Sequence, residues 1–206
     1  MSDPPTSARW DAPGPPGSTP LEPDDLVGLI PTWVATRGDL NEAEQKNILD
    51  GLSRSRWRRP SVEKVLDDDA VRKLHKDMFG QVWKWAGSYR SREVNIGNVA
   101  PYQVAGCVRD LTEDARLWIG GDHPMPADEV AYRFHHRLVE IHPFPNGNGR
   151  QARAITDLLL RALGQPAFTW GGSSLDVEGA IRSAYIDALR AADAGDFALL
   201  AAFVRS

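Results

Sequence analysis

Two apolar stripes at helical spacing are joined by a segment that cannot continue either helix, and this connection constrains the fold more than any other part of the chain. Apolar side chains recur at helical spacing over residues 130–138 before the connection and over residues 155–163 after it. The connection reads His-Pro-Phe-Pro-Asn-Gly-Asn-Gly-Arg over residues 142–150. Pro143 and Pro145 lack an amide donor and fix φ, so the first helix must end near them. The sequence therefore predicts two helices with a sharp bend between them.

The residue types of this connection are those of a site for a phosphorylated ligand. Residues 146–149 suit a tight turn, and the next helix should start at about Gly149, leaving its first amides without intrahelical partners. Such a helix start binds anions, because several N–H groups and the helix dipole point at one spot. Arg150 and Arg153 lie three apart on the first turn and add two guanidiniums. His142, with an ordinary pKa of about 6.5, can accept a proton beside them. This combination predicts transfer of a phosphoryl-type group onto a hydroxyl.

The rest of the chain has helical periodicity with one small β element. Residues 1–24 hold seven of the fifteen prolines and no periodic apolar pattern, so we expect a disordered Pro/Gly-rich tail. Residues 25–60 should form an N-terminal helical extension and residues 61–206 the main domain. Residues 92–103 contain a glycine, a proline and several β-favouring side chains, which predicts a hairpin or extended flap. The expected fold class is an all-α helical bundle with a small β-hairpin flap.

Composition narrows the class of protein. Hydrophobic residues make up 42% of the chain, enough for a core, but no apolar run approaches the roughly 20 residues needed to cross a bilayer, so no membrane partner is expected. The first residues carry no secretory signal and the single cysteine excludes an internal disulfide, so the expected compartment is the cytoplasm. A formal charge of −4 argues against a nucleic-acid partner.

A histidine-metal site built from His135, His136 and His142 is one alternative. In a continuous helix His135 and His142 would lie about 10 Å apart along the axis, farther than one ion spans. The usual helical ligand spacing is also absent. We therefore expect His135 to be packed and His136 to pair with Glu140 at the surface.

The string over residues 142–153 resembles the Fic signature HxFx[DE]GNGRxxR at every specified position except one. Shorter stretches resemble the segments of Fic proteins before and after it, namely residues 74–79, 85–87 with Arg90, and 191–196. The resemblance covers roughly residues 62–205. From about Leu26 onward the chain is similar to the bacterial subgroup called mobile mystery protein B.

This resemblance implies a mostly helical Fic fold and a protein adenylyltransferase, which moves AMP from ATP to a tyrosine, threonine or serine hydroxyl of a target protein, usually with Mg²⁺. By the resemblance, His142 is the general base that deprotonates the hydroxyl. The phosphate-binding set it implies is Asn146, Gly147, Asn148, Gly149, Arg150 and Arg153. The flap it implies would align the target by strand addition through Val94, Asn95, Ile96 and Gly97.

Asn146 is the one departure, because the family has an acid that binds magnesium at this position. A carboxamide is a neutral and weaker ligand for a hard cation, which leaves Asn146 a weak metal candidate. Three alternatives stay open beside AMP transfer with Mg²⁺: a differently held metal, a Fic enzyme that transfers another phosphate-containing group, or a weakened or non-catalytic nucleotide-binding protein. The last would act with an antitoxin or regulatory protein in a toxin–antitoxin-like pair.

Many Fic proteins are restrained by a glutamate in the string [ST]xxxE[GN], which pairs with the second arginine of the signature. Residues 174–179 fit that string, although Ser173 or Ser174 would also serve as a cap of the next helix. Glu42 and Glu44 lie on the predicted N-terminal helix, where such a glutamate can also occur, but lack the required neighbours. Autoinhibition is therefore an open question from the sequence.

Overall fold

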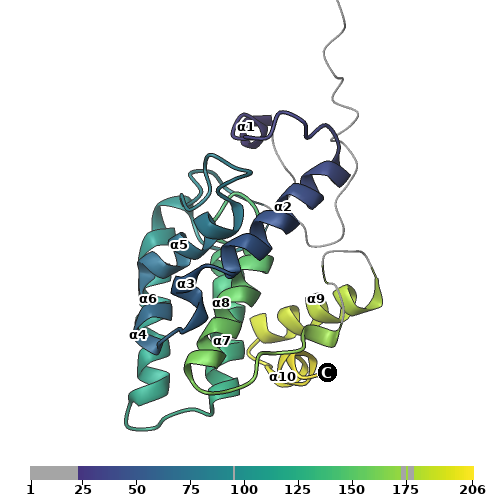
Figure 1. The fold of residues 1–206 in the computed structure, drawn as a ribbon. Helices are drawn as coiled ribbons and strands as arrows, with labels where there is room; N and C mark the ends of the chain where they lie inside the picture. Colours follow the sequence, from purple (N-terminus) through teal and green to yellow (C-terminus); the bar gives the residue numbers. More distant parts are fainter. Residues whose placement is uncertain (1–22, 95, 173–174, 176–178) are drawn as a thin grey trace, which may run out of the picture.

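The two helices expected around the proline-containing connection form as α7 (Ala127–Ile141) and α8 (Asn148–Ala162), and they pack against each other at the centre of the domain (Figure 1). The computed structural model describes residues 23–94, 96–172, 175 and 179–206, so the expected disordered tail lies almost wholly outside the described residues. The other helices are α1 (Pro23–Leu26), α2 (Arg37–Leu52), α3 (Ser55–Arg58), α4 (Val62–Val65), α5 (Asp68–Phe79), α6 (Val104–Gly120), α9 (Ala180–Asp193) and α10 (Ala198–Val204). Short 3-10 turns occur as η2 (Pro101–Gln103) and η3 (Trp170–Gly172). The prediction of a mostly helical fold is confirmed.

Local capping explains where two of these helices begin. Thr36 is the N-cap of α2, and its side chain and that of Asp39 each accept a backbone N–H of the other residue. After Pro60 the chain forms two helices, α4 and α5, because the Asp67 side chain accepts the Asp69 N–H and starts a new helix. Gly80 is the C-cap of α5.

The helices bury two apolar clusters. The larger cluster joins α2, α4, α5, α6 and the facing sides of α7 and α8, with α2 packed along α5 (Figure 1). The smaller cluster packs α9 and α10 against α7 and α8 through Ala131 and Leu160. The loop between α7 and α8 therefore lies at one end of a fully packed helix pair. No helix in the described residues is both long and apolar enough to span a membrane.

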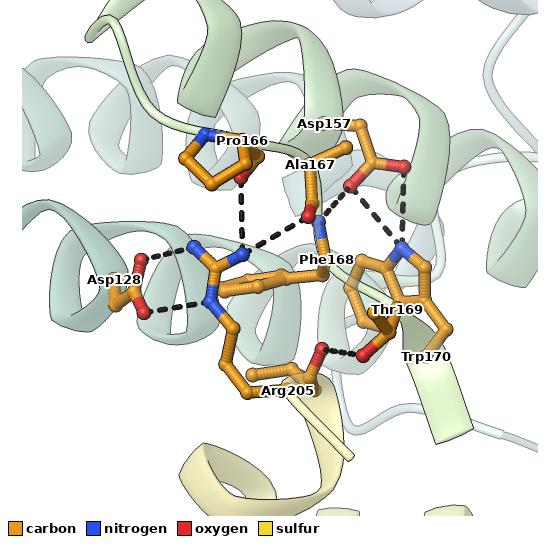
Figure 2. A network of polar contacts seen from close by, with 9 residues as sticks. Asp128, Asp157, Pro166, Ala167, Phe168, Thr169, Trp170 and Arg205 are labelled. Carbon is orange, nitrogen blue, oxygen red and sulfur yellow. Dashed lines mark hydrogen bonds and ion pairs between the residues drawn. The ribbon is translucent and has the colours of Figure 1, made fainter. Parts of the chain in front are cut away.

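A polar network attaches the C-terminal end of the chain to the opposite end of α7 (Figure 2). The Arg205 guanidinium donates to Asp128 on the first turn of α7 and to the carbonyls of Pro166 and Ala167. Asp157 of α8 accepts the Trp170 indole N–H at 3.2 Å. Burial raises the pKa of Asp157 to about 6, and the hydrogen bond from Trp170 opposes this rise.

The predicted β-hairpin is not formed in the described residues between 92 and 103. Those residues before Ala100 are bends and irregular backbone, and η2 begins at Pro101. The single β-bridge in the part of the chain that the structure describes pairs Leu29 with Trp83. The hairpin fails because the carbonyls of Arg92 and Val99 accept hydrogen bonds from the Arg90 side chain instead of from a facing strand. Asn95 lies outside the described residues.

Candidate active site

The bend after α7 is made by His142 itself. His142 is the C-cap of α7 and has the left-handed values φ 51° and ψ 61°, which cost energy for a residue with a side chain. Phe144 follows and is fully buried, with its ring stacked on His75 at a centroid distance of 3.7 Å. The bend is therefore held by the core through the buried ring of Phe144.

His75 of α5 fixes the middle of the loop. Its Nδ1 accepts the Gly87 N–H at 3.0 Å, so its Nε2 carries the proton and donates to the Asn146 carbonyl at 3.0 Å. Burial lowers the pKa of His75 to about 3, which keeps the imidazole neutral at physiological pH. In the sequence, His75 stood out only through the resemblance, since its partners are distant along the chain.

Gly147 lies immediately before α8, the helix whose start was predicted to bind phosphate. It is the N-cap of α8 with φ 79°, and a Cβ at this position would lie 2.7 Å from the Phe79 ring, so only glycine fits. The helix starts at Asn148, one residue earlier than expected, and no side chain caps it. The Asn148 side chain both accepts from the Phe144 N–H and donates to the Phe144 carbonyl, each at 2.8 Å. In this conformation Asn148 can offer a ligand its backbone N–H, while its carboxamide shapes the loop.

The Asn146 side chain bears on the question of a metal ion. Its Oδ1 accepts the Gly147 N–H at 2.6 Å, so its oxygen is already engaged with the loop backbone. The described residues contain no group of three or more His, Cys, Asp or Glu side chains placed to hold a metal ion. A neutral oxygen that is already hydrogen-bonded fits Mg²⁺ poorly, because this ion favours charged oxygen ligands.

His142 has the protonation state that a base needs. Its side-chain Nδ1 lies 3.1 Å from the Val139 carbonyl, which can only accept, so Nδ1 carries the proton and Nε2 carries the lone pair. Burial lowers the pKa of His142 to about 4; the bond to Val139 opposes this effect, and the nearby charge of Arg90 adds to it. The imidazole is consequently neutral at pH 7, although its weak basicity limits how strongly it attracts a proton.

Arg150 is held by a carboxylate from the N-terminal helix. Its guanidinium donates to Glu44 Oε2 at 2.7 Å and lies over the Phe79 ring at 5.0 Å. Glu44 is buried, and its Oε1 accepts the Trp83 indole N–H at 2.7 Å. Glu44 is thus ion-paired with an arginine that was expected to bind phosphate. The sequence did not indicate this ion pair.

Arg153 lies near the Tyr185 hydroxyl. Burial raises the pKa of Tyr185, and the nearby guanidinium of Arg153 opposes this rise, while the same hydroxyl bonds His135 Nε2 at 2.8 Å. One of the terminal nitrogens of Arg153 lies 3.6 Å from where a Cβ on Gly149 would be, so Arg153 folds back over the start of α8. Arg150 is thus paired with Glu44 from α2, while Arg153 lies near Tyr185 of α9.

His135 is placed as the sequence predicted, whereas His136 is not. His135 is fully buried, as expected, and burial lowers its pKa to about 3. His136 bonds Asp193 at 2.8 Å, so its expected pairing with Glu140 is wrong. Glu140 instead pairs with Arg137 at 2.7 Å.

The flap residues lie beside the base. Val94 and Ile96 are half-buried, and Gly97 is exposed with φ 93°. A Cβ on Gly97 would lie 2.5 Å from the Glu140 carbonyl oxygen and 3.2 Å from the His142 Cβ. The structure thus brings the predicted flap, the predicted base and the predicted anion-binding helix start to one end of the α7–α8 pair.

The chain is similar to known proteins over most of its helical part. Residues 65–160 match the model of the Fic/DOC family. Protein adenylyltransferase fic-1 of Caenorhabditis briggsae is 32% identical over 143 residues, which cover 66% of this chain and 25% of that protein. Protein adenylyltransferase Fic of Drosophila melanogaster is 28% identical over 137 residues, covering 65% of this chain and 26% of that protein. The chain thus spans about a quarter of the length of these curated relatives.

Solved structures show the same fold. Fic-1 of Caenorhabditis elegans (residues 134–508) superposes with a TM-score of 0.62 at 25% identity, over 86% of this chain and 50% of that one. The BepC effector protein of Bartonella tribocorum, solved with bound AMPPNP, gives a TM-score of 0.64 at 16% identity, over 84% of this chain and 87% of that one.

Proposed function

Residues 65–160 form a Fic/DOC-family domain, and on that premise we propose that this chain transfers AMP from ATP to a hydroxyl side chain of a target protein. The observation that carries the proposal is the junction of α7 and α8. There a neutral imidazole and the uncapped start of a helix lie at the two ends of one five-residue loop. The adenylyltransferase names of the relatives support the choice of AMP as the transferred group.

In the proposed reaction, His142 Nε2 takes the proton of a tyrosine, threonine or serine hydroxyl as its oxygen attacks the α-phosphorus of ATP. The bond from the α-phosphorus to the bridging oxygen breaks, and pyrophosphate leaves. The Val139 carbonyl holds the imidazole in the tautomer that leaves Nε2 unprotonated. The α8 dipole and the first amides of the helix, those of Asn148 and Gly149, face the negative charge of the phosphates, while the Gly147 N–H donates to Asn146 and shapes the turn.

The arginines and the flap complete the proposed site. We assign Arg150 and Arg153 to the phosphates of the nucleotide, with the Glu44 carboxylate opposing the approach of a phosphate to Arg150. Asn146 acts through its backbone carbonyl, which His75 holds, and through its Oδ1 on the Gly147 N–H. The flap at Val94, Ile96 and Gly97, with Asn95 between them, aligns the target segment beside His142. ATP is a substrate of this reaction, and the loop side chains by themselves fit Mg²⁺ poorly.

A second function is a nucleotide-binding partner with weak or no transfer, acting with an antitoxin or regulatory protein. Two features favour it: the missing acid at Asn146, and the Glu44–Arg150 ion pair that occupies a phosphate ligand. Transfer of a phosphate group other than AMP is a variant of the main proposal. It uses the same base and the same helix start.

Incubation of the purified chain and cell lysate with α-labelled ATP and Mg²⁺ or Mn²⁺ tests the proposal. We expect labelled protein with the wild-type chain and none with His142→Ala, while both bind a fluorescent ATP analogue. Nucleotide binding without label in either lysate or the chain itself would instead support the nucleotide-binding partner. Label from γ-labelled ATP alone would indicate phosphate transfer.

A further inference from the structure

Arg90 is the most fully enclosed guanidinium near the proposed site, and its partners are backbone carbonyls from two separate segments. Its side chain is only 1% exposed. Nε donates to the His142 carbonyl at 2.8 Å, and one terminal nitrogen reaches the Ile141 carbonyl at 3.4 Å. The terminal nitrogens also donate to the carbonyls of Arg92, at 3.0 Å, and Val99. One planar group thus holds the end of α7 and both sides of the flap.

The end of α7 needs such a partner. The last carbonyls of a helix have no intrahelical donor, and a cation at that end also faces the negative pole of the helix dipole. The Arg90 backbone adds a further tie, since its N–H donates to the Pro143 carbonyl at 2.9 Å. These bonds lie on both sides of the His142 Cα, where the backbone takes its left-handed turn. Arg90 therefore fixes the turn that aims the imidazole.

Charge neutralisation does not explain why a cation is buried here. The acid paired with Arg90 is Glu93, whose side chain is 75% exposed and whose Oε2 lies 3.8 Å away, so this ion pair contributes little. The guanidinium is instead held by its carbonyl partners, whose fork geometry a lysine cannot reproduce. Arg90 therefore fixes the position of the flap relative to the end of α7.

The flap contacts the base at a second point. The Gly97 backbone lies so close to residues 140 and 142 that a Cβ would meet the Glu140 carbonyl oxygen at 2.5 Å and the His142 Cβ at 3.2 Å. Arg90 holds the two sides of the flap, while Gly97 rests on the last turn of α7. Together they leave the flap little freedom to move relative to the imidazole.

We propose that Arg90 is a positioning residue that couples the flap to His142, setting the distance between a target segment docked on the flap and the atom that takes its proton. This inference rests on the proposed function, because it needs the flap to hold the target. Arg90 touches neither the target nor the nucleotide. Its loss should impair use of the target and leave nucleotide binding at α8 intact.

The test compares Arg90→Gln, Arg90→Lys and Gly97→Ala with the wild-type chain, using α-labelled ATP and lysate protein as the acceptor. We expect affinity for a fluorescent ATP analogue to stay within about twofold, since α8 is not altered. Label transfer should fall by about 10- to 100-fold, the order expected for a reacting group displaced by about 1 Å, and the half-saturating lysate concentration should rise. Arg90→Lys should recover little of this loss, because one ammonium cannot reach both segments.

Arg205→Gln is the matched control. It removes a guanidinium that also joins separate segments through carbonyls and a carboxylate (Figure 2). This network lies at the first turn of α7, whereas the flap lies at the last turn. It should lower thermal stability and leave the rate of transfer per folded molecule unchanged. A general effect of destabilisation would instead lower transfer in both Arg90→Gln and Arg205→Gln.

If Arg90→Gln does not fold, Gly97→Ala decides the question, since Gly97 is exposed and its substitution displaces the flap without emptying a buried position. Wild-type transfer by Gly97→Ala, or by a folded Arg90→Gln, would overturn the inference alone. Absence of label with the wild-type chain would overturn the proposed function itself. The two failures are therefore distinguishable.

Discussion

Replacing Glu44 with glutamine should strengthen nucleotide binding, because it removes a negative charge from the place where a phosphate must approach Arg150. The Glu44 carboxylate lies 2.7 Å from the guanidinium and is almost fully buried. A phosphate that accepts from the N–H groups of Arg150 that Glu44 leaves open would lie about 5–6 Å from this carboxylate. At an effective dielectric constant of about 20, each unit of phosphate charge is then repelled by about 3 kcal/mol, or roughly 100-fold in affinity before solvent screening.

Glutamine is the suitable replacement because its Oε1 can still accept the Trp83 indole N–H. Breaking the ion pair leaves Arg150 without its carboxylate, but that side chain is 23% exposed and can be solvated, so we expect a stability loss of only about 1–2 kcal/mol. Glu42→Gln is the control, since it changes the same charge at an exposed position of α2.

The assay is titration of each variant with a fluorescent ATP analogue, followed by label transfer from α-labelled ATP. We predict that Glu44→Gln binds the analogue about 10- to 100-fold more tightly and transfers more label than the wild type, after allowance for screening. Glu42→Gln should match the wild type in both assays. Equal affinity in Glu44→Gln and the wild type would refute the reasoning, because Arg150 would then not be a phosphate ligand restrained by Glu44.

Three further predictions concern the loop and its histidines. Chemical denaturation should show stability falling as the pH drops from 6.5 towards 4, since the unfolded chain then binds protons that buried His75, His135 and His142 do not. The raised pKa of Asp157 opposes this effect, so that near pH 5 the unfolded chain binds about two protons more than the folded chain. The free energy of unfolding should therefore change by roughly 2–3 kcal/mol per pH unit, and a flat profile would contradict the burial of these rings. Gly147→Ala should lower the melting temperature by about 5–10 °C, because the Cβ strains the backbone and meets the Phe79 ring; an unchanged value in a thermal melt would contradict the loop geometry. Asn146→Asp should lower the half-saturating Mg²⁺ concentration for label transfer by about tenfold, and no change would mean that position 146 contacts no metal.

The pH dependence of transfer should differ from the pH dependence of stability. The lowered pKa of His142 means that its basic form persists down to about pH 4, so loss of its basic form should not reduce transfer between pH 8 and pH 6. An acidic limb with a midpoint near 6.5 would show that the imidazole is solvated in the working enzyme.

Local patterns were sufficient to predict α7, α8 and the bend between them, because apolar spacing and proline act within a few residues of the chain. The same holds for the glycine at position 147, whose left-handed turn is a property of its own backbone. The Asp67 cap that divides α4 from α5 was missed, because one aspartate in an acidic run gives no distinct signal.

Contacts between distant segments could not be predicted. Glu44 and Arg150 are 106 residues apart, and neither residue type indicates the other. The flap shows a different limit: its residue types have a β-like pattern, but two of its carbonyls accept from the nearby side chain of Arg90, and alternation of residue types does not indicate such a bond. The glutamate at position 178, in the string that resembles an inhibitory motif, lies outside the described residues.

The central claim is that an imidazole and a helix start joined by one loop move AMP from ATP to a protein hydroxyl. Mass spectrometry of lysate proteins after exposure to the purified chain and ATP tests it most directly, with His142→Ala as the paired sample. We predict tyrosine, threonine or serine side chains that carry the mass of AMP in the wild-type sample and lack it in the His142→Ala sample. AMP on the same side chains in both samples, or a phosphate in its place, would show that this chain does not transfer AMP through His142.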